Sequence, residues 1–101
     1  MASVHRSTKA EADLETILDD LDQNDPAVAV RYALAFKQKA DALAQFPEMG
    51  RARPEIAPDL RSTLVRPYVL FYQIAGDEVH IVRILHGKQD LKRILQAEGE
   101  G

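Results

Sequence analysis

The first part of the chain carries apolar residues at helical spacing. They recur at i, i+3, i+4 and i+7 along one stripe, formed by Leu14, Ile17, Leu18 and Leu21. This pattern predicts an amphipathic helix over residues 9–22. Thr8 and Glu11 match the S/T-x-x-E capping box, in which the hydroxyl and the carboxylate satisfy free backbone N–H groups, so Thr8 is the predicted N-cap. The short segment 3–7 before this helix has the character of an edge strand.

A second helix is predicted from Asp25 to the residue before Pro47. Asp25 is a good N-cap, and Pro26 takes the N1 position, where the missing N–H of proline is no loss. Frequent alanines favour helix, and a larger apolar face is marked by Val28, Tyr32, Phe36, Leu43 and Phe46. Because few residues separate the two helices, we expect them to form an antiparallel hairpin.

The pattern changes in the second half of the chain. Segment 47–59 contains three prolines and Gly50, which is typical of a loop. Apolar and β-branched residues then predict three strands, at 60–65, 68–74 and 78–85. The middle strand is apolar on both faces and is therefore expected at the covered centre of the sheet, and Gly76-Asp77 marks a hairpin turn after it. Segment 88–97 favours either one short helix or a frayed end.

The resulting order of elements is β-α-α-β-β-β, with a short C-terminal helix as the optional last element. Such a chain packs its helical hairpin on one face of a small antiparallel sheet, which makes a two-layer α+β domain. A length of 101 residues is that of one domain, so we interpret residues 1–101 as a single unit.

Composition and charge narrow the classes of function. The chain has no cysteine, which excludes disulfides, thiolate metal sites and a cysteine nucleophile. A polar N-terminus and the lack of any apolar run long enough to span a bilayer predict a cytoplasmic protein without membrane contact. The net charge is −3, although residues 51–93 hold eight Lys and Arg against five Asp and Glu. A nucleic-acid contact would therefore need a local basic patch.

Five segments, taken in order, resemble one known family. They are EADLETI (11–17), NDPAVAVRY (24–32), LAQFPEMGRARPEI (43–56), LRSTLVRPYVLFYQI (60–74) and VHIVRILHGKQDL (79–91). This ordered set is similar to the ParE/RelE superfamily of bacterial toxins from type II toxin–antitoxin modules, and to its ParE branch most closely.

The resemblance implies a toxin that works without a cofactor and has a cognate antitoxin as its partner. That antitoxin would be ParD-like, with a DNA-binding half, and would form a hetero-oligomer with the toxin. ParE-like toxins act on DNA gyrase and arrest growth, which implies a non-enzymatic inhibitor. RelE-like relatives instead cut mRNA on the ribosome, and an inactive toxin retained for antitoxin binding is a further alternative. One fold hosts these activities, so fold alone does not decide among them.

The ribonuclease alternative can be weighed on the residues themselves. Cleavage through the 2′-OH needs a general base, a general acid and a cation for the phosphate, and the available groups are Arg61, Tyr72, Arg83 and His86. On an ideal strand residues 83 and 86 point to opposite faces, so they would converge only if the strand bends near Gly87. The negative net charge also works against binding ribosomal RNA.

For the gyrase alternative, the basic C-terminal region is the predicted target surface, formed by Arg83, His86, Lys88, Asp90 and Arg93. The same residues have a structural interpretation. Arg83 would then pair with a carboxylate such as Asp90, His86 would end the strand, and Gly87 would supply a positive φ. We favour this structural role for His86 over a catalytic one, because a lone histidine without a partner base is a weak signal.

A groove between the helical hairpin and the sheet is the predicted site for the antitoxin. The predicted contacts are Val28, Tyr32, Phe36, Arg51, Arg53, Tyr68 and Leu70. The apolar members of this set have core packing as their alternative, since such residues usually fill cores. The three histidines are scattered along the chain, so no metal site is predicted.

Overall fold

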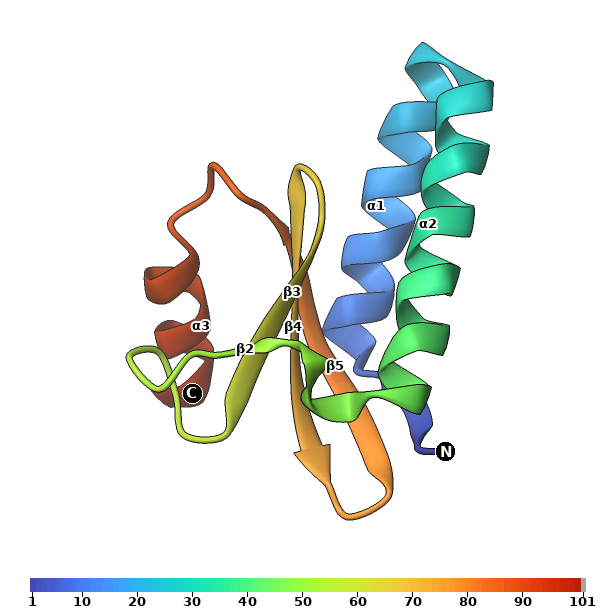
Figure 1. Cartoon of the computed structure of the whole chain (residues 1–101). Helices are drawn as coiled ribbons and strands as arrows, with labels where there is room; N and C mark the ends of the chain where they lie inside the picture. Colours follow the sequence, from blue (N-terminus) through green and yellow to red (C-terminus); the bar gives the residue numbers. More distant parts are fainter. Residues whose placement is uncertain (101) are drawn as a thin grey trace.

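The computed structural model describes residues 1–100 as a sheet with helices on both faces (Figure 1). A five-stranded sheet in the order β1-β5-β4-β3-β2 lies between a long helical hairpin and one short helix. The elements are β1 (Ser3–Arg6), α1 (Thr8–Asn24), α2 (Pro26–Gln45), the 3-10 turn η1 (Pro47–Met49), β2 (Arg51–Ala52), β3 (Leu60–Val65), β4 (Tyr68–Ala75), β5 (Glu78–His86) and α3 (Leu91–Glu100).

The predicted α+β class and its element order are confirmed, with two additions. The C-terminal helix α3 forms and makes a third layer where two were predicted. The sheet is mixed, because β1 runs parallel to β5 while the other neighbours are antiparallel. The two-residue strand β2 lies inside the segment predicted to be a loop, where it pairs with Arg61 and Ser62 of β3.

The two long helices begin at different kinds of cap. Asp25 caps α2 as predicted, since its carboxylate accepts a hydrogen bond of 3.1 Å from the N–H of Ala27. For α1 the predicted capping box is wrong by one residue. The N-cap is Ser7, whose hydroxyl accepts from the N–H of Ala10 at 3.0 Å and donates to the carbonyl of Val82 at 2.9 Å. The carboxylate that the box assigned to the cap pairs with Arg6 instead.

Strand β4 separates two apolar cores, as its two apolar faces predicted. Leu70 and Tyr72 face the helical hairpin, where they pack with Phe36, Leu43 and the buried residues of β5. Val69 and Phe71 face the other way and are covered with help from α3. No helix in residues 1–100 combines the length and the apolar character that crossing a membrane requires.

The segment after α2 is fixed by one buried phenol. The hydroxyl of Tyr72 donates to the carbonyl of Pro47 at 2.7 Å and accepts from the N–H of Gly50 at 2.8 Å. Arg61 donates to the carbonyl of Gly50 at 2.9 Å and to that of Glu48 at 3.1 Å. A Cβ atom on Gly50 would lie 2.4 Å from the Tyr72 hydroxyl and 2.8 Å from the Ser62 carbonyl, so only glycine fits.

The substitution Gly50→Ala should lower the free energy of unfolding by about 1–3 kcal/mol, because the added methyl must displace a buried hydroxyl and a strand carbonyl. Urea denaturation measures this loss. The matched control is Gly76→Asn, since a Cβ on Gly76 meets nothing within 4 Å and asparagine tolerates its φ of +59°. Equal losses in the two variants would contradict the proposed tight packing at Gly50.

Candidate functional site

Strand β5 changes its surroundings halfway along its length. Its first half, up to Ile81, pairs with β1, and its second half has α1 along its edge instead. Within the second half, β5 carries a bulge: Tyr72 lies opposite Ile81, whereas Phe71 lies opposite Arg83, so Val82 is an extra residue. Arg83, the residue directly after the bulge, contacts both helical layers.

Arg83 is held by carboxylates from two helices. Its guanidinium donates to both carboxylate oxygens of Asp13 on α1, at 2.7 and 2.9 Å, and to Glu98 on α3. The Arg83 and Asp13 side chains are only 16% and 15% exposed. The hydrogen bonds that Arg83 donates to Asp13 raise the pKa of Arg83, so this cation stays charged. Asp13 also accepts the N–H of Ile84 at 2.9 Å, which satisfies the edge of β5.

The structural interpretation of Arg83 is therefore right in kind and wrong in its partner. Asp90 does not pair with Arg83. It caps α3, where its carboxylate accepts from the N–H of Arg93 at 3.3 Å. The bonds to Asp13 and Glu98 use much of the Arg83 guanidinium, so this residue positions the site and offers little free charge to a partner.

A polar groove opens beside this ion pair, between α1 and the end of β5. Its volume is about 310 Å³, and it is lined by Asp13, Thr16, Ile17, Asp20, Tyr68, Arg83, Ile84, Leu85, His86 and Gln89. One wall is the acidic face of α1, and the other is the end of strand β5, from Arg83 to His86. The groove brings Tyr68, a predicted antitoxin contact, together with Arg83 and His86 of the predicted target surface.

His86 is fixed by its own turn. Its Nδ1 accepts the N–H of Lys88 at 3.1 Å, and its backbone N–H donates to the Gln89 side chain at 2.7 Å. The ring meets Tyr68 edge to face, with centroids 5.6 Å apart. Only Nε2 of His86 is left for an outside partner. Because the Lys88 N–H occupies Nδ1, the neutral ring carries its proton on Nε2.

The turn after His86 explains the glycine in a different way from the prediction. The expected positive φ at Gly87 is wrong, since among the described glycines a positive φ belongs to Gly76. A Cβ on Gly87 would lie 3.1 Å from the Pro67 carbonyl, which accepts the N–H of Gly87 at 2.9 Å. Close backbone approach, and not handedness, is the requirement at this position.

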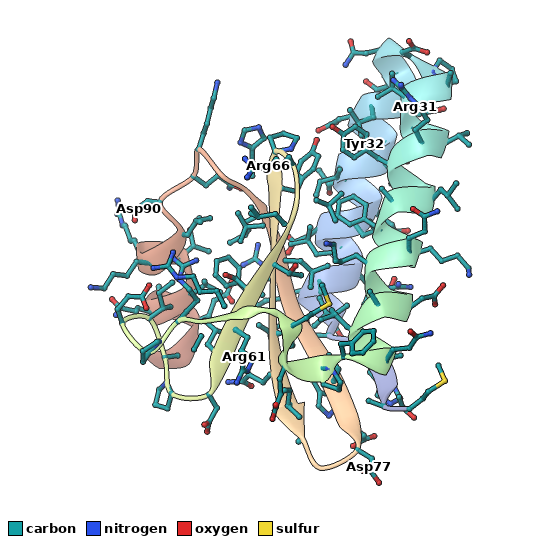
Figure 2. All side chains as sticks on the ribbon, viewed as in Figure 1. Arg31, Tyr32, Arg61, Arg66, Asp77 and Asp90 are labelled. Carbon is teal, nitrogen blue, oxygen red and sulfur yellow. The ribbon has the colours of Figure 1, made fainter. Side chains whose placement is uncertain are left out.

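Of the four residues predicted for ribonuclease chemistry, Arg83 and His86 line the same groove, whereas Tyr72 and Arg61 are outside it. Tyr72 is fully buried, and burial raises the pKa of its phenol, so it is neither accessible nor a ready base. Arg61 donates to two carbonyls beside it, and Figure 2 shows it far along the sheet from Arg66. His86 lies opposite Tyr68 on β4. Because Tyr68 and Tyr72 are four residues apart on this strand, His86 is about 13 Å from Tyr72.

The remaining members of the predicted target surface are exposed. Lys88 lies in the turn after His86, and Asp90 and Arg93 lie at the start of α3. In Figure 2 Asp90 lies on the side of α3 that faces away from the sheet. Sequence reasoning missed Gln89, which lines the groove and accepts the N–H of His86 at 2.7 Å.

The predicted antitoxin contacts divide among three places. Phe36 and Leu70 are 5% and 1% exposed, so they belong to the core and not to a surface. Val28, Tyr32 and Tyr68 are partly exposed on the side of the hairpin. The hydroxyl of Tyr32 donates to the Arg66 carbonyl at 2.9 Å, and the two residues lie near each other in Figure 2.

The two predicted arginines lie elsewhere on the sheet. Arg51 is exposed on the edge strand β2. Arg53 lies over the Phe71 ring, 5.8 Å from its centroid, on the face that α3 covers. Its guanidinium is engaged by Glu55 at 2.8 Å and by the Ser62 hydroxyl at 3.1 Å. The seven predicted antitoxin contacts therefore do not form one continuous surface.

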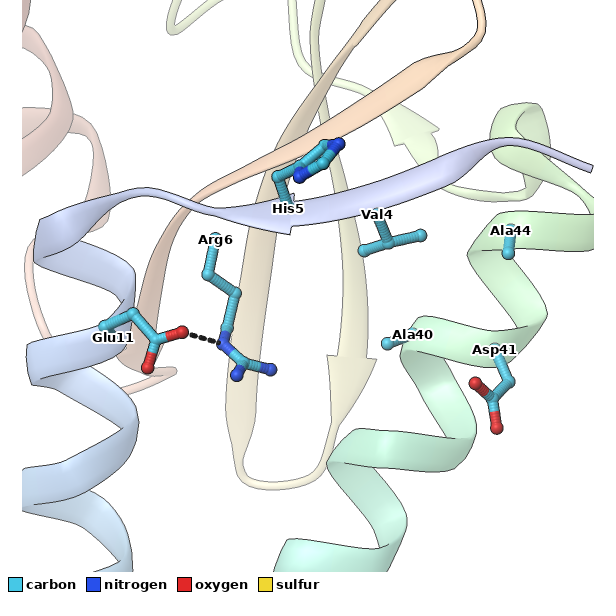
Figure 3. A pocket seen from close by; sticks show the side chains of 7 residues that line it. All are labelled: Val4, His5, Arg6, Glu11, Ala40, Asp41 and Ala44. Atoms are coloured by element: carbon cyan, nitrogen blue, oxygen red, sulfur yellow. Dashed lines mark hydrogen bonds and ion pairs between the residues drawn. The ribbon is translucent and has the colours of Figure 1, made fainter.

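A separate hollow lies between β1 and α2 (Figure 3), lined by Val4, His5, Arg6, Glu11, Ala40, Asp41 and Ala44. Arg6 and Glu11 pair there at 2.7 Å and neutralise each other. His5 stacks on His80, with centroids 5.6 Å apart, so two of the histidines that look scattered in sequence are neighbours. Across residues 1–100, no group of three or more His, Cys, Asp or Glu side chains could hold a metal ion.

Comparison with known proteins agrees with this architecture. Residues 4–91 match the family described as "ParE toxin of type II toxin-antitoxin system, parDE". The chain is 44% identical over 86 residues to Toxin RelE2 of Caulobacter vibrioides, covering 85% of this chain and 96% of that protein. It is 32% identical over 95 residues to Toxin ParE3 of the same organism, with coverages of 90% and 92%.

Solved structures lead to the same group. The structure titled "Chromosomal ParDE TA system from P. aeruginosa" superposes with a TM-score of 0.71 at 30% identity, over 85% of this chain and 96% of that one. The fold and the relatives define a toxin of a type II toxin–antitoxin system. The chain belongs to the ParE toxin family within the wider ParE/RelE group.

Removing the carboxylate that orients Arg83 should destabilise the fold. We expect Asp13→Ala to lower the free energy of unfolding by about 3 kcal/mol, the lower end of the range for a buried pair that loses one partner. Thermal or urea unfolding measures the loss. The control is Asp41→Ala, which breaks an exposed pair with Lys37 at 3.4 Å and should change stability by less than about 0.5 kcal/mol. A small effect of Asp13→Ala would refute the structural role.

Proposed function

We propose that this ParE-family toxin arrests growth by binding DNA gyrase, and that it does so without catalysing a reaction. The observation that carries this proposal is the state of the groups a ribonuclease would need. Tyr72 is buried and doubly hydrogen-bonded, Arg61 is bound to carbonyls, and Arg83 is bound to two carboxylates. His86 keeps one free ring nitrogen, but none of the other three residues supplies the second acid or base that cleavage needs.

The proposed target surface is the His86 turn and the start of α3. Lys88 and Arg93 supply exposed positive charge there, and Asp90 fixes the helix that carries Arg93. Arg83 acts beneath this surface by joining β5 to α1 and α3. Exposed cations of this kind contribute mainly to the rate and specificity of association with an acidic partner surface.

We further propose that a cognate antitoxin neutralises the toxin. The ParDE title of the P. aeruginosa structure supports a toxin–antitoxin assembly for this family. Val28, Tyr32 and Tyr68 are the proposed contacts on the hairpin side, and Arg51 and Arg53 are proposed contacts at the β2 edge. Phe36 and Leu70 are left out of this proposal because they are buried.

Ribosome-dependent cleavage of mRNA is the second candidate. The observation that favours it is the name RelE2 of the relative that is 44% identical to this chain. In that case His86 would be the first residue to test, because Nδ1 accepts the N–H of Lys88 and only Nε2 is left to face a substrate in the groove. Sequencing of transcript ends in expressing cells would reveal cleavage, which the gyrase proposal does not produce.

The decisive experiment is DNA supercoiling by purified gyrase with antitoxin-free toxin added. We expect dose-dependent inhibition that antitoxin relieves. The double variant Lys88→Glu, Arg93→Glu should lose inhibition by about tenfold or more, because it reverses two charges on the proposed target surface. Its matched control is Arg31→Glu, Lys37→Glu, which makes the same charge change on exposed positions of α2 and should retain inhibition.

Three results would count against the proposal. One is a folded toxin that leaves supercoiling unchanged. Another is equal loss of inhibition in both double variants, which would show a general charge effect in place of a defined surface. The third is cleavage of transcripts by the folded toxin, abolished by His86→Ala, which would establish the ribonuclease instead.

A further inference from the structure

The two ring nitrogens of His86 have different surroundings. Nδ1 accepts the N–H of Lys88 at 3.1 Å, whereas no hydrogen bond within the described residues uses Nε2. In the described chain no buried side-chain nitrogen or oxygen lacks a partner, so Nε2, which has none, is open to solvent. His5 and His80 contact Glu78 at 3.3 and 3.5 Å, but among the described residues no carboxylate pairs with His86. The outward nitrogen of His86 is therefore free to meet another molecule.

The turn after His86 determines which nitrogen carries the proton. A neutral imidazole has one N–H group and one nitrogen with a lone pair. The N–H of Lys88 needs the lone pair at Nδ1, so the proton of the neutral ring lies on Nε2. A general base needs its lone pair on the side of the substrate, and the outward nitrogen of this ring has none. In its neutral form His86 is therefore an outward hydrogen-bond donor.

The backbone of this turn is fixed by three hydrogen bonds. The N–H of His86 donates to the side-chain oxygen of Gln89 at 2.7 Å, and the carbonyl of His86 accepts the N–H of Gln89 at 3.0 Å. The next residue, Gly87, donates its N–H to the carbonyl of Pro67 at 2.9 Å. Together these bonds hold the N–H of Lys88 opposite Nδ1. Gln89 thus acts on the ring of His86 through the backbone.

The plane of the imidazole is fixed by aromatic packing. His86 lies opposite Tyr68 in the sheet, and the two rings meet edge to face with their centroids 5.6 Å apart. Tyr68 is held in turn by Tyr32 and Phe36 of α2, whose centroids lie 5.6 and 5.8 Å from its own. Burial raises the pKa of the Tyr68 phenol, so this neighbour stays uncharged. A ring fixed in this way loses little freedom when its N–H is bound.

The groove limits the kind of oxygen that can accept this proton. His86 belongs to one wall, and Asp13 and Asp20 belong to the wall formed by α1. Arg83 neutralises Asp13, whereas Asp20 pairs with no cation in the part of the chain that the structure describes. An anion in the groove would be repelled by Asp20, but an uncharged oxygen would not. The acceptor that fits is therefore the carbonyl of a peptide or carboxamide group.

We propose that the Nε2–H of His86 donates a hydrogen bond to an uncharged carbonyl oxygen of the target protein, and that Gln89 and Tyr68 position this donor. The inference rests on gyrase as the proposed target and assigns one contact on the proposed target surface. Lys88 and Arg93 supply charge around this contact and act mainly on the rate of association. The hydrogen bond acts at short range and depends on direction, so His86 serves binding without transferring a proton.

Binding of the antitoxin-free toxin to purified gyrase tests the contact. His86→Asn keeps an oxygen in the place of Nδ1 that can accept the N–H of Lys88, but it has no N–H in the place of Nε2. We expect the dissociation constant to rise about tenfold, as loss of one hydrogen bond does. The matched control is His80→Asn, which removes a half-exposed histidine of the same strand outside the groove and should leave binding unchanged.

Salt distinguishes a neutral acceptor from a carboxylate. The loss of binding in His86→Asn, relative to the parent protein, should be equal at low and high salt, because screening acts on charges. The loss in Lys88→Glu, Arg93→Glu should instead shrink as salt is added. A loss in His86→Asn that also shrinks with salt would overturn the proposed carbonyl, since the acceptor would then be charged.

The nitrogen chemical shifts of the imidazole test the positioning in the free toxin. At about pH 8, where an unperturbed imidazole is neutral, the shifts of His86 should place the proton on Nε2 alone. Gln89→Met removes the oxygen that holds the turn, and Tyr68→Leu removes the ring beside His86. Both variants should give a mixture of the two tautomers and should bind gyrase more weakly. His80→Asn should leave the shifts of His86 unchanged.

The possible failures can be told apart. Equal binding of the parent protein and His86→Asn would remove the contact and leave gyrase as the target. A proton on Nδ1 in the parent protein would overturn the fixed donor, and a mixture of tautomers in Gln89→Met without weaker binding would overturn the positioning role. If the parent protein does not bind gyrase at all, the proposed target is wrong and the contact falls with it.

Discussion

The ion pair between Asp13 and Arg83 joins all three layers of this molecule. One carboxylate on α1 accepts from Nε and Nη2 along one edge of a guanidinium on β5 and also accepts the N–H of Ile84, while Nη1 of the same guanidinium donates to Glu98 on α3. Because both side chains of the pair are largely buried, neither could lose its partner without leaving a charge out of water. The pair therefore fixes the position of α1, the course of β5 and the placement of α3 together.

The sheet has two ends that are built by different interactions. At one end, the bulge in β5 and the Arg83 pair set the His86 turn and the start of α3. At the other end, the Tyr72 hydroxyl fixes the chain between α2 and β2 through Pro47 and Gly50. The first end is polar and partly basic, whereas the second exposes Phe46 and Met49.

Much of the fold could be predicted because helices and strands depend on local patterns. The stripe of α1, the cap of α2 at Asp25 and the two apolar faces of β4 all follow from residues near one another in the sequence. The partner of Arg83 could not be found this way, because Asp13 lies seventy residues earlier in the chain. Strand β2 escaped prediction because two residues carry no periodicity.

The candidate site was harder to predict than the fold, for a related reason. Sequence shows that Arg61, Tyr72, Arg83 and His86 have useful chemistry, but it does not show which of them are already engaged. Burial of Tyr72 and the contacts of Arg61 depend on Gly50 and its neighbours, which pass beneath β3 and β4. Which carbonyls need a side-chain donor, and which phenols are buried, is known only when segments that are distant in sequence are placed together.

The pairing of Arg83 with Asp13 also bears on how one fold supports both binding and catalysis. To contact a scissile phosphate, Arg83 would have to leave Asp13, and the carboxylate would then remain largely buried without its cation. The N–H of Ile84 would keep Asp13 as its acceptor, but α1 would be held to the edge of β5 by this one hydrogen bond of Asp13 in place of three. In this chain, freeing the arginine for catalysis would therefore oppose the stability of the strand that carries it. A relative that cleaves RNA would need another cation for the phosphate, or another partner for the carboxylate on α1.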